Sequence, residues 1–267
     1  MSLLHLLMLA LVQGITEFLP VSSSGHLILF PVLLGIEDQG VVLDVAVHVG
    51  TLGAVMIYFR SEVLCAIKGG FRLLRGDFQS ADARLAILLI LSTIPVILFG
   101  LFLKLTGFSD ALRSVAVIGW TMLIFGLVLY WADRTGPSTN TAADWTIRDA
   151  FIMGLWQAIA LIPGTSRSGI TITGARALGY NREDAARLSM LMSIPTIIAS
   201  GALLAGDVVS QANWQLARDA GFAALLAFFA ALTALALMMR LLKSISFTPY
   251  VIYRVFLGLG LLWLAYS

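Results

Sequence analysis

The feature that most constrains this chain is a series of long apolar stretches that contain almost no charged residue. A helix that spans a bilayer needs about 20 mostly apolar residues. Six stretches meet this requirement without interruption: 41–59, 85–106, 114–131, 188–206, 220–241 and 250–266. The sequence therefore predicts an all-α polytopic membrane protein with six transmembrane helices, folded as a single integral membrane domain over residues 1–267.

The composition excludes several other classes of protein. Of the 267 residues, 59% are hydrophobic and only 12% are charged, whereas a soluble domain carries about 25% charged residues. So little charge cannot cover a water-facing surface, which excludes an ordinary cytosolic enzyme, a disordered protein and a nucleic-acid binder. The single cysteine, Cys65, excludes an intramolecular disulfide and a cysteine-based zinc site. No basic residue precedes the apolar start, so we expect this start to be mature structure rather than a cleaved signal.

Two further apolar stretches, 1–34 and 150–180, are interrupted near the middle by proline, glycine and a run of hydroxyl residues. Broken helices persist at membrane depth where their freed backbone groups face protein or a wet cavity. We therefore expect two re-entrant helix–loop–helix hairpins beside the six spans. The alternative, eight full spans, would distribute the basic segments less consistently between the two sides of the membrane.

The distribution of Lys and Arg predicts the orientation of the chain. The strongest basic cluster lies in 60–84, and cytoplasmic loops are enriched in Lys and Arg. Counting six spans from there places three more arginine-containing segments on the same side: 132–149, 176–187 and 240–249. The segments on the opposite side are poor in positive charge: 35–40, 107–113 and 207–219. Both termini are then expected on the non-cytoplasmic side.

The two interrupted stretches resemble each other. In the segments Gln13–His26 and Gln157–Gly169, a glutamine precedes a Ser-x-Ser-Gly sequence by the same spacing, with a proline between them. Each copy is followed by three spans, and three is odd, so the halves, about 1–131 and 150–267, are expected to form an inverted repeat. Such repeats with broken helices place a polar site near the middle of the bilayer.

The interruptions carry the chemically active side chains. An ionisable group at membrane depth is costly and by default faces a functional cavity. The first interruption presents Gln13, Glu17, Ser22, Ser23, Ser24 and His26, and the second presents Thr165, Ser166, Arg167, Ser168, Thr171 and Thr173. Arginine binds phosphate oxygens bidentately, a carboxylate can hold a divalent cation, and histidine exchanges protons near neutral pH. Together these groups favour a phosphate-handling site.

The same polar residues also have purely structural interpretations. Gln13 and Glu17, four residues apart, could form a structural hydrogen-bonded pair at the helix break. Hydroxyl runs in membrane helices often only satisfy backbone carbonyls or allow close packing. His5 and His48 lack such a set of polar neighbours and are expected to be ordinary residues. Asp44, four residues before His48, is expected at the rim of the site.

In these two interrupted stretches the chain resembles a known family. The resemblance rests on Gln13-Gly-Ile-Thr-Glu17-Phe-Leu-Pro20-Val-Ser22-Ser23-Ser24-Gly25-His26 and on Pro163-Gly-Thr165-Ser166-Arg167-Ser168-Gly169-Ile-Thr171. The family is the undecaprenyl-diphosphate phosphatases, bacterial integral-membrane enzymes linked to bacitracin resistance. The resemblance covers the whole length and implies hydrolysis of undecaprenyl diphosphate to undecaprenyl phosphate and inorganic phosphate, which recycles the lipid carrier of cell-wall synthesis. It also implies a divalent cation, Mg or Ca, and a location in the bacterial cytoplasmic (inner) membrane.

The resemblance also implies roles for single residues. Glu17 would bind the metal or orient the base, and Ser23 and His26 would supply the nucleophile and its partner. Arg167 would clamp the diphosphate, and the expected substrate-binding residues are Gln13, Ser22, Ser24, Ser166, Ser168 and Thr171. Gln13 stands where many members have Glu, and a neutral amide is a weaker second metal ligand than a carboxylate.

Two mechanisms and two alternative functions remain open. Either Ser23 attacks the terminal phosphorus while His26 takes its proton, or His26 attacks directly and forms a phosphohistidine. The main alternative function is a secondary transporter or lipid-carrier flippase, because inverted repeats with re-entrant hairpins are a transporter architecture. A phosphatidic-acid-type lipid phosphatase would need a second histidine near the Ser-Arg motif, and neither His5 nor His48 is near it.

The expected partners follow from this reading. They are a polyprenyl diphosphate substrate and membrane lipids, with no nucleic acid, and a homodimer remains an open alternative. Because the basic loop 60–84 is expected inside the cell, the active site is expected to open to the non-cytoplasmic side of the membrane.

Overall fold

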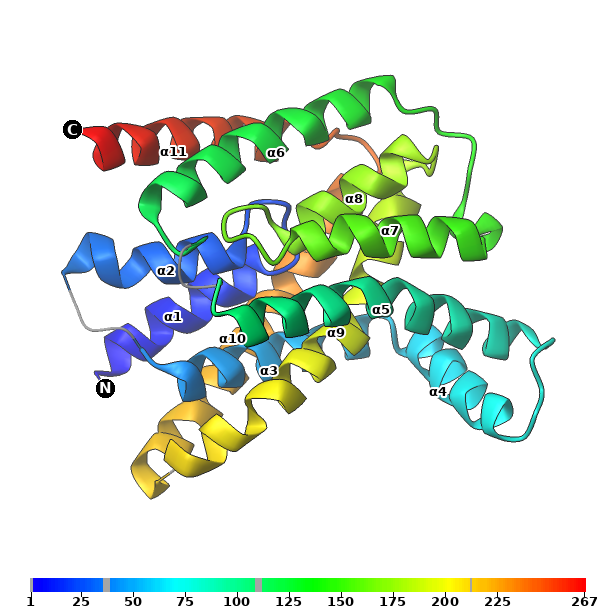
Figure 1. Ribbon diagram of the computed structural model, residues 1–267, viewed down its shortest axis with the longest axis horizontal. Coiled ribbons are helices and arrows are strands. Elements are labelled where there is room, and N and C mark those ends of the chain that lie inside the picture. The colour runs from blue at the N-terminus through cyan, green and yellow to red at the C-terminus, as the bar shows by residue number, and fades with distance from the viewer. Residues whose placement is uncertain (1, 36–38, 109–111, 212) are drawn as a thin grey trace.

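The long apolar stretches are helices in the computed structural model, which describes residues 2–35, 39–108, 112–211 and 213–267 (Figure 1). Within these ranges, six helices are long and apolar enough to cross a membrane. They are α3 (Val41–Tyr58), α5 (Ala81–Thr106), α6 (Val115–Thr135), α9 (Arg182–Gln211), α10 (Trp214–Leu241) and α11 (Thr248–Tyr266). The prediction of an all-α membrane protein with six apolar helices of spanning length is confirmed.

Several of these helices begin before the apolar stretch from which they were predicted. The side chain of Ser80 accepts a hydrogen bond from the backbone N–H of Ala83 at the start of α5, and Asn213 caps α10 in the same way. Such N-caps satisfy backbone donors that have no partner inside the helix. α5 and α10 therefore start at 81 and 214, ahead of the expected 85 and 220, because the caps precede the apolar residues.

The two interrupted stretches are each a pair of helices joined by a loop. α1 (Leu3–Thr16) and α2 (Ser23–Leu34) form the first pair, and α7 (Ile147–Ile159) and α8 (Arg167–Ala177) form the second. α1 packs on α10, and α7 packs on α5. α8 lies between α6, α7 and α9, and its residues from Ser168 to Arg176 are all buried.

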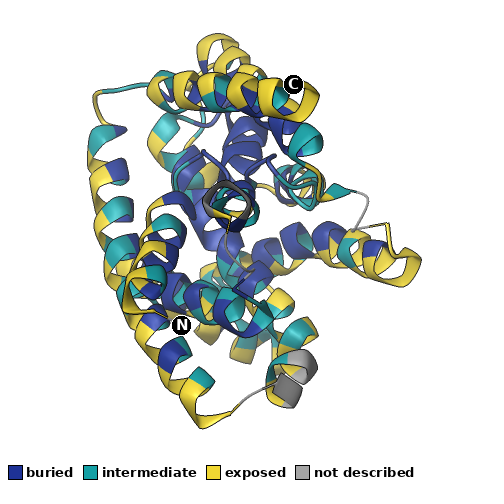
Figure 2. Ribbon diagram, turned by 90° about the vertical axis from the view of Figure 1, so that its left-hand side faces the viewer, coloured by how far each residue is buried: buried dark blue, intermediate teal, exposed yellow. Residues whose placement is uncertain are grey.

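The outer surface of the molecule is apolar, as a lipid-facing surface must be. Figure 2 shows the buried residues gathered in the centre and the exposed ones along the outer helices. Exposed aromatic side chains on the candidate spans include Phe102, Trp131, Phe229, Phe256 and Trp263. A soluble monomer rarely exposes an apolar surface of this extent.

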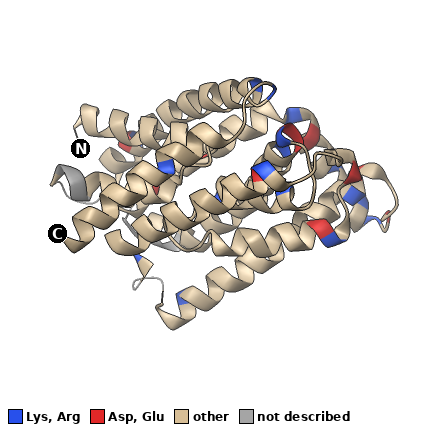
Figure 3. Cartoon of the chain, turned by 90° about the horizontal axis from the view of Figure 1, so that it is seen from above, with Lys and Arg blue, Asp and Glu red and all other residues tan. Residues whose placement is uncertain are grey.

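Charged side chains gather at one end of the molecule. Figure 3 shows most of them opposite the end where both termini lie. The basic segments expected on the cytoplasmic side are therefore found together. Of the segments expected at the other end, residues 36–38 and 109–111 lie outside the described part of the chain.

One helix was missed in the sequence. Residues 60–84 were expected to form a loop, but Arg60–Leu74 is a helix, α4, that packs on α5. Its exposed large side chains form one apolar stripe: Leu64, Ile67, Phe71 and Leu74. An apolar stripe on a helix rich in basic residues is typical of a helix that lies along a membrane interface. The basic residues between the apolar ones made the segment resemble a charged loop.

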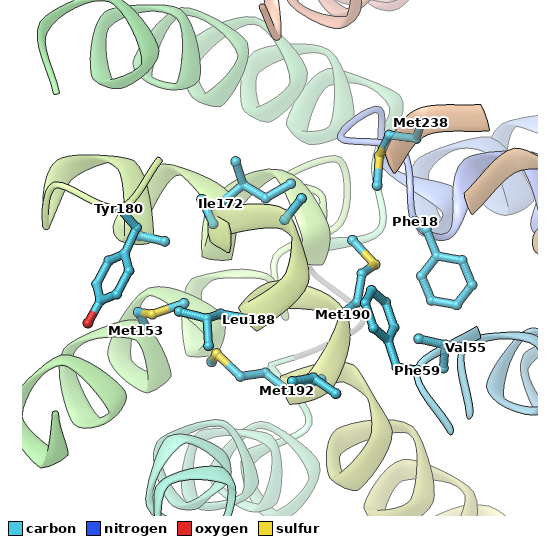
Figure 4. Close-up of a cluster of buried hydrophobic side chains, with 14 of the residues drawn as sticks. Phe18, Val55, Phe59, Met153, Ile172, Tyr180, Leu188, Met190, Met192 and Met238 are labelled. Carbon is cyan, nitrogen blue, oxygen red and sulfur yellow. The ribbon is translucent and has the colours of Figure 1, made fainter. Parts of the chain in front are cut away.

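The largest hydrophobic core surrounds the first residues of α9. Figure 4 shows Met190 of this helix beside Phe18 and Phe59, with Met238 of α10 above them. Phe18 follows directly after Glu17, so the core anchors the loop that ends α1. Each of these four side chains is at most 6% exposed.

Close packing of α3 on α10 generates a test of this arrangement. A Cβ atom on Gly50 would collide with the backbone carbonyl of Ala224, and overpacking typically costs about 1–3 kcal/mol. We expect Gly50→Ala to lower the melting temperature of the purified protein in detergent. The matched control is Gly221→Ala on α10, where no heavy atom lies within 4 Å of the added Cβ. Equal melting temperatures for the two variants would contradict the packing described.

Candidate active site

The two loops have the same unusual backbone. Ser22 caps α2 and Ser166 caps α8, with φ angles of 74° and 72°. No other non-glycine residue with positive φ is found in the described part of the chain. Each serine side chain accepts a hydrogen bond from the backbone N–H three residues on, that of Gly25 or Gly169. Non-glycine residues in this conformation are strained and are concentrated at functional sites.

The loops meet through a partly buried ion pair. Arg167 Nη2 donates to Glu17 Oε1 at 2.8 Å, and the two side chains are 14% and 5% exposed. Glu17 Oε2 accepts hydrogen bonds from Gln13 Nε2 at 2.8 Å and from Ser23 Oγ at 2.7 Å. The two interruptions therefore bring a carboxylate, a guanidinium and a serine hydroxyl into contact, as expected if the two loops meet.

A cavity of about 600 Å³ opens beside this contact. Glu17, Ser23 and Arg167 line its polar end, together with Ser24 and Ser166. The remaining wall is mostly apolar and comes chiefly from α3 and α9, including Val45, Val49, Ile197 and Leu204. Such a cavity can accept a ligand that combines a charged head with an apolar chain.

The other expected hydroxyl residues support the loops rather than line the cavity. Ser168 Oγ donates to Leu19 O at 2.9 Å and so ties α8 to the first loop. Thr171 Oγ1 donates to Arg167 O and lies 2.6 Å from Ser189 Oγ. Ser22 is a buried cap. For Ser168 and Thr171 the geometry matches the plainer interpretation, in which hydroxyls satisfy backbone carbonyls.

His26 lies apart from the ion pair and does not line the cavity. Its Nδ1 is 2.6 Å from Ser22 O, and because a carbonyl only accepts, Nδ1 carries the proton. Nε2 then accepts a hydrogen bond from the hydroxyl of Tyr253 on α11, at 2.6 Å. The two rings stack with centroids 5.7 Å apart. Both ring nitrogens of His26 are thus engaged away from Ser23 and Glu17, which differs from the expected Ser23–His26 pair.

His48, expected to be an ordinary residue, lies at the site instead. Its Nε2 is 3.8 Å from Glu17 Oε2, and the side chain lines the cavity. Asp44, one turn earlier on α3, lines the same cavity, as does Arg113 near the start of α6. The sequence contained a signal for this, the i, i+4 spacing of Asp44 and His48. Glu17, directly after α1, lies 31 positions away from His48, and only folding brings the two together.

A buried arginine on α11 holds the loop before α8. Arg254 of α11 is completely buried and donates to backbone carbonyls of both α6 and the loop. Its Nη2 is 2.8 Å from Thr165 O and 3.2 Å from Gly164 O. Arg254 therefore fixes the backbone immediately before Ser166 and Arg167. The sequence reading did not single it out, because it stands alone in an apolar helix far from either loop.

A resident metal ion does not fit these residues by themselves. Within the described ranges, no three His, Cys, Asp or Glu side chains are placed to hold a metal ion together, and three donors already occupy Glu17. The cavity does carry a second carboxylate, Asp44. Mg²⁺ in phosphate-transfer sites uses one or two carboxylates together with phosphate oxygens and water. The residues therefore fit a cation that binds together with a phosphate-bearing ligand.

Comparison with known proteins shows the family to which this chain belongs. The sequence model of the family described as "Bacitracin resistance protein BacA" matches residues 6–260. A protein of Roseobacter denitrificans named undecaprenyl-diphosphatase is 66% identical over 267 residues, and one of Jannaschia sp. with the same name is 67% identical, each alignment covering 100% of both chains. A third, from Saccharophagus degradans, is 47% identical over 98% of this chain and 97% of its own. The chain belongs to the BacA bacitracin-resistance family.

Proposed function

We propose that this chain hydrolyses undecaprenyl diphosphate to undecaprenyl phosphate and inorganic phosphate, and thereby recycles the lipid carrier of cell-wall synthesis. The observation that carries the proposal is the contact of Glu17, Ser23 and Arg167 at the polar end of a largely apolar cavity. The relatives, identical at up to 67% of positions over the full length, are named for this activity.

The cavity suits a lipid diphosphate in both of its parts. Arg167 at the polar end offers a guanidinium fork to phosphate oxygens, and Arg113 lines the cavity as a second cation. Val49, Ile197 and Leu204 offer an apolar wall to the start of the prenyl chain. Val41 at the start of α3 and Arg113 just before α6 both line the cavity, which supports a mouth at the end of the molecule where these helices begin.

In the mechanism we favour, Ser23 is the nucleophile. Its Oγ forms a bond to the terminal phosphorus, its proton passes to Glu17 Oε2, and the bridging P–O bond breaks with its electron pair kept by undecaprenyl phosphate. Water then hydrolyses the phosphoserine. Arg167 stabilises the charge on the transferring phosphoryl group, which is the main demand of phosphoryl transfer. The engagement of both His26 nitrogens by Ser22 and Tyr253 favours this route over direct attack by His26.

A divalent cation, Mg or Ca, belongs to this proposal. Glu17 and Asp44 are the carboxylates that would hold it together with the substrate phosphates. When bound, the cation neutralises phosphate charge. Gln13 directs its amide nitrogen at Glu17, so in this chain the glutamine acts as a donor that holds the carboxylate in place.

The two helix pairs are, in this proposal, re-entrant hairpins of an inverted repeat. Ser22 and Ser166 have nearly equal φ angles, 74° and 72°. Gln13 and Gln157 are both completely buried. The packing of α1 on α10 corresponds to that of α7 on α5. These matching features support a common structure for the halves, with the site between them.

The same proposal places the protein in the bacterial inner membrane with the cavity open to the non-cytoplasmic side. The basic segments lie together at the end of the molecule opposite the termini (Figure 3). Because positive loops remain in the cytoplasm, the opposite end, with the cavity mouth, faces outward.

Replacement of the ion pair tests the activity. We expect Arg167→Ala to reduce phosphate release from undecaprenyl diphosphate in the presence of Mg or Ca by about 10³-fold or more, and Glu17→Gln by roughly 10²–10⁴-fold. The measurement is phosphate released by purified protein in detergent. Arg148→Ala is the matched control, because Arg148 is exposed and does not line the cavity. Absence of phosphate release from the folded wild-type protein would instead favour a transporter or flippase.

Trapping of the intermediate tests the nucleophile. With substrate labelled at the terminal phosphorus, rapid acid quenching should yield label that is stable in acid and maps to Ser23, because phosphoserine is a phosphate ester. Ser24→Ala should retain the label and Ser23→Ala should lose it. Acid-labile label on His26 would overturn the serine mechanism.

Cysteine labelling tests the orientation. In a Cys65→Ser background, we expect Gln215→Cys to react with a membrane-impermeant maleimide added to intact spheroplasts. Gln79→Cys, between α4 and α5, and Ser244→Cys, between α10 and α11, change exposed residues and should react only after permeabilisation. The reverse pattern would place the cavity mouth in the cytoplasm.

A further inference from the structure

Arg254 on α11 is a completely buried cation beside the second loop. Its Nε and Nη2 atoms donate to four backbone carbonyls, those of Met122 and Thr121 on α6 and those of Gly164 and Thr165 before α8. Its Nη1 atom is also buried, and no group in the described ranges forms a hydrogen bond with it. Carbonyl oxygens satisfy N–H donors but carry no net negative charge, so these contacts leave the charge of the guanidinium uncompensated.

The two arginines of α8 differ from Arg254 in having a carboxylate partner. Arg167 pairs with Glu17 at 2.8 Å. Arg176, which is 2% exposed, pairs with Asp133 at 3.2 Å. None of the ion pairs among the described residues includes Arg254. Because removing a charge from water is costly, buried charges are normally paired, and a counter-charge from outside the chain would offset this cost.

The unpaired Nη1 of Arg254 faces the beginning of α8. A Cβ atom added to Gly169 would lie 2.8 Å from this Nη1 and 3.1 Å from Ser166 Oγ. Ser166 lines the polar end of the cavity, so the guanidinium lies directly behind the loop that forms this end. α8 begins at Arg167, and the N-terminus of a helix carries a partial positive charge. Arg254 and the helix end therefore add positive potential at the same place.

We propose that Arg254 is a positioning residue whose charge, from behind the loop, strengthens the binding of the diphosphate group. This inference rests on the proposed hydrolysis and deepens it. Arg254 does not line the cavity, so it acts on the ligand through its electric field and through the loop carbonyls that it holds. The negative charge of the ligand in turn supplies the counter-charge that Arg254 lacks among the described residues.

The size of the effect follows from Coulomb's law. Two unit charges one loop thickness apart, about 8–10 Å, at an effective dielectric constant of about 20, change a binding constant by roughly 20-fold. A diphosphate carries more than one negative charge, whereas water in the open cavity weakens the interaction. We therefore expect removal of the charge of Arg254 to weaken diphosphate binding by about 10–100-fold.

Two substitutions separate the charge of Arg254 from its hydrogen bonds. Arg254→Lys keeps the positive charge but loses the planar fork that binds several carbonyls at once. Arg254→Gln keeps a donor for a carbonyl but removes the charge. If Arg254 only held the loop, both variants would bind diphosphate weakly, whereas the electrostatic role requires the loss in Arg254→Gln alone.

The test is the binding of inorganic diphosphate to the full-length protein in detergent with Mg²⁺. Isothermal titration calorimetry at about pH 6.5 gives the Kd under a condition that favours a protonated lysine. We expect the Kd to increase by about 10–100-fold in Arg254→Gln and by less than about fivefold in Arg254→Lys. With undecaprenyl diphosphate as the substrate, KM should follow the same order.

Arg176→Gln is the matched control, because Arg176 is a buried arginine too but pairs with Asp133 in the last turn of α8. Its Kd for diphosphate should remain close to the wild-type value. Gel filtration in detergent identifies the folded fraction of each variant. If Arg254→Gln does not fold, Arg254→Lys decides by itself, since a purely structural role requires weak binding in it as well.

The possible results separate this inference from the proposed hydrolysis. An unchanged Kd in folded Arg254→Gln, or binding weakened by about tenfold or more in folded Arg254→Lys, would overturn the role of the charge and leave the hydrolysis intact. Absence of diphosphate binding by the wild-type protein would also overturn that role. Diphosphate binding that depends on the charge of Arg254, without phosphate release from the lipid substrate, would overturn the hydrolysis.

Discussion

The structure depends on the partly buried ion pair between Glu17 and Arg167. Removing two charges from water costs several kcal/mol per ion, about as much as the pair recovers unless further hydrogen bonds satisfy both partners. Glu17 has those bonds, from Gln13 and Ser23, and Arg167 adds a contact to Ser189 O at 3.5 Å. The pair therefore requires both loops to be in place, and it joins two segments 150 residues apart.

The rest of the fold fixes the conformation of these two loops. The core around Met190 anchors Phe18, next to Glu17, and Arg254 binds the carbonyls before Ser166. At the charged end of the molecule, buried Asp133 pairs with both Arg176 and Arg182, which ties the end of α8 to α6 and α9. Strain at Ser22 and Ser166 persists because packing on all sides determines the loop conformation.

Much of the fold could be predicted because it depends on local composition. The lengths of the apolar stretches set the six spans, and proline and hydroxyl residues mark both breaks. α4 was not predicted because its basic residues are typical of a cytoplasmic loop, although its apolar residues from Leu64 to Leu74 recur at helical spacing. At the site, Glu17, Ser23 and Arg167 were predictable since each lies inside a break, where a polar group in an apolar stretch needs a partner.

The sequence by itself determined that this chain is a helical membrane protein, where its helices break, and which charged groups lie inside the breaks, because membrane burial penalises charge and unpaired backbone groups at every position. Only the tertiary structure decided which histidine lies beside Glu17. His26 follows the motif but turns toward Tyr253, whereas His48, between apolar neighbours, reaches the carboxylate from α3. Helical periodicity places a residue on a face of its own helix, but the residue that faces it depends on how helices distant in sequence pack together.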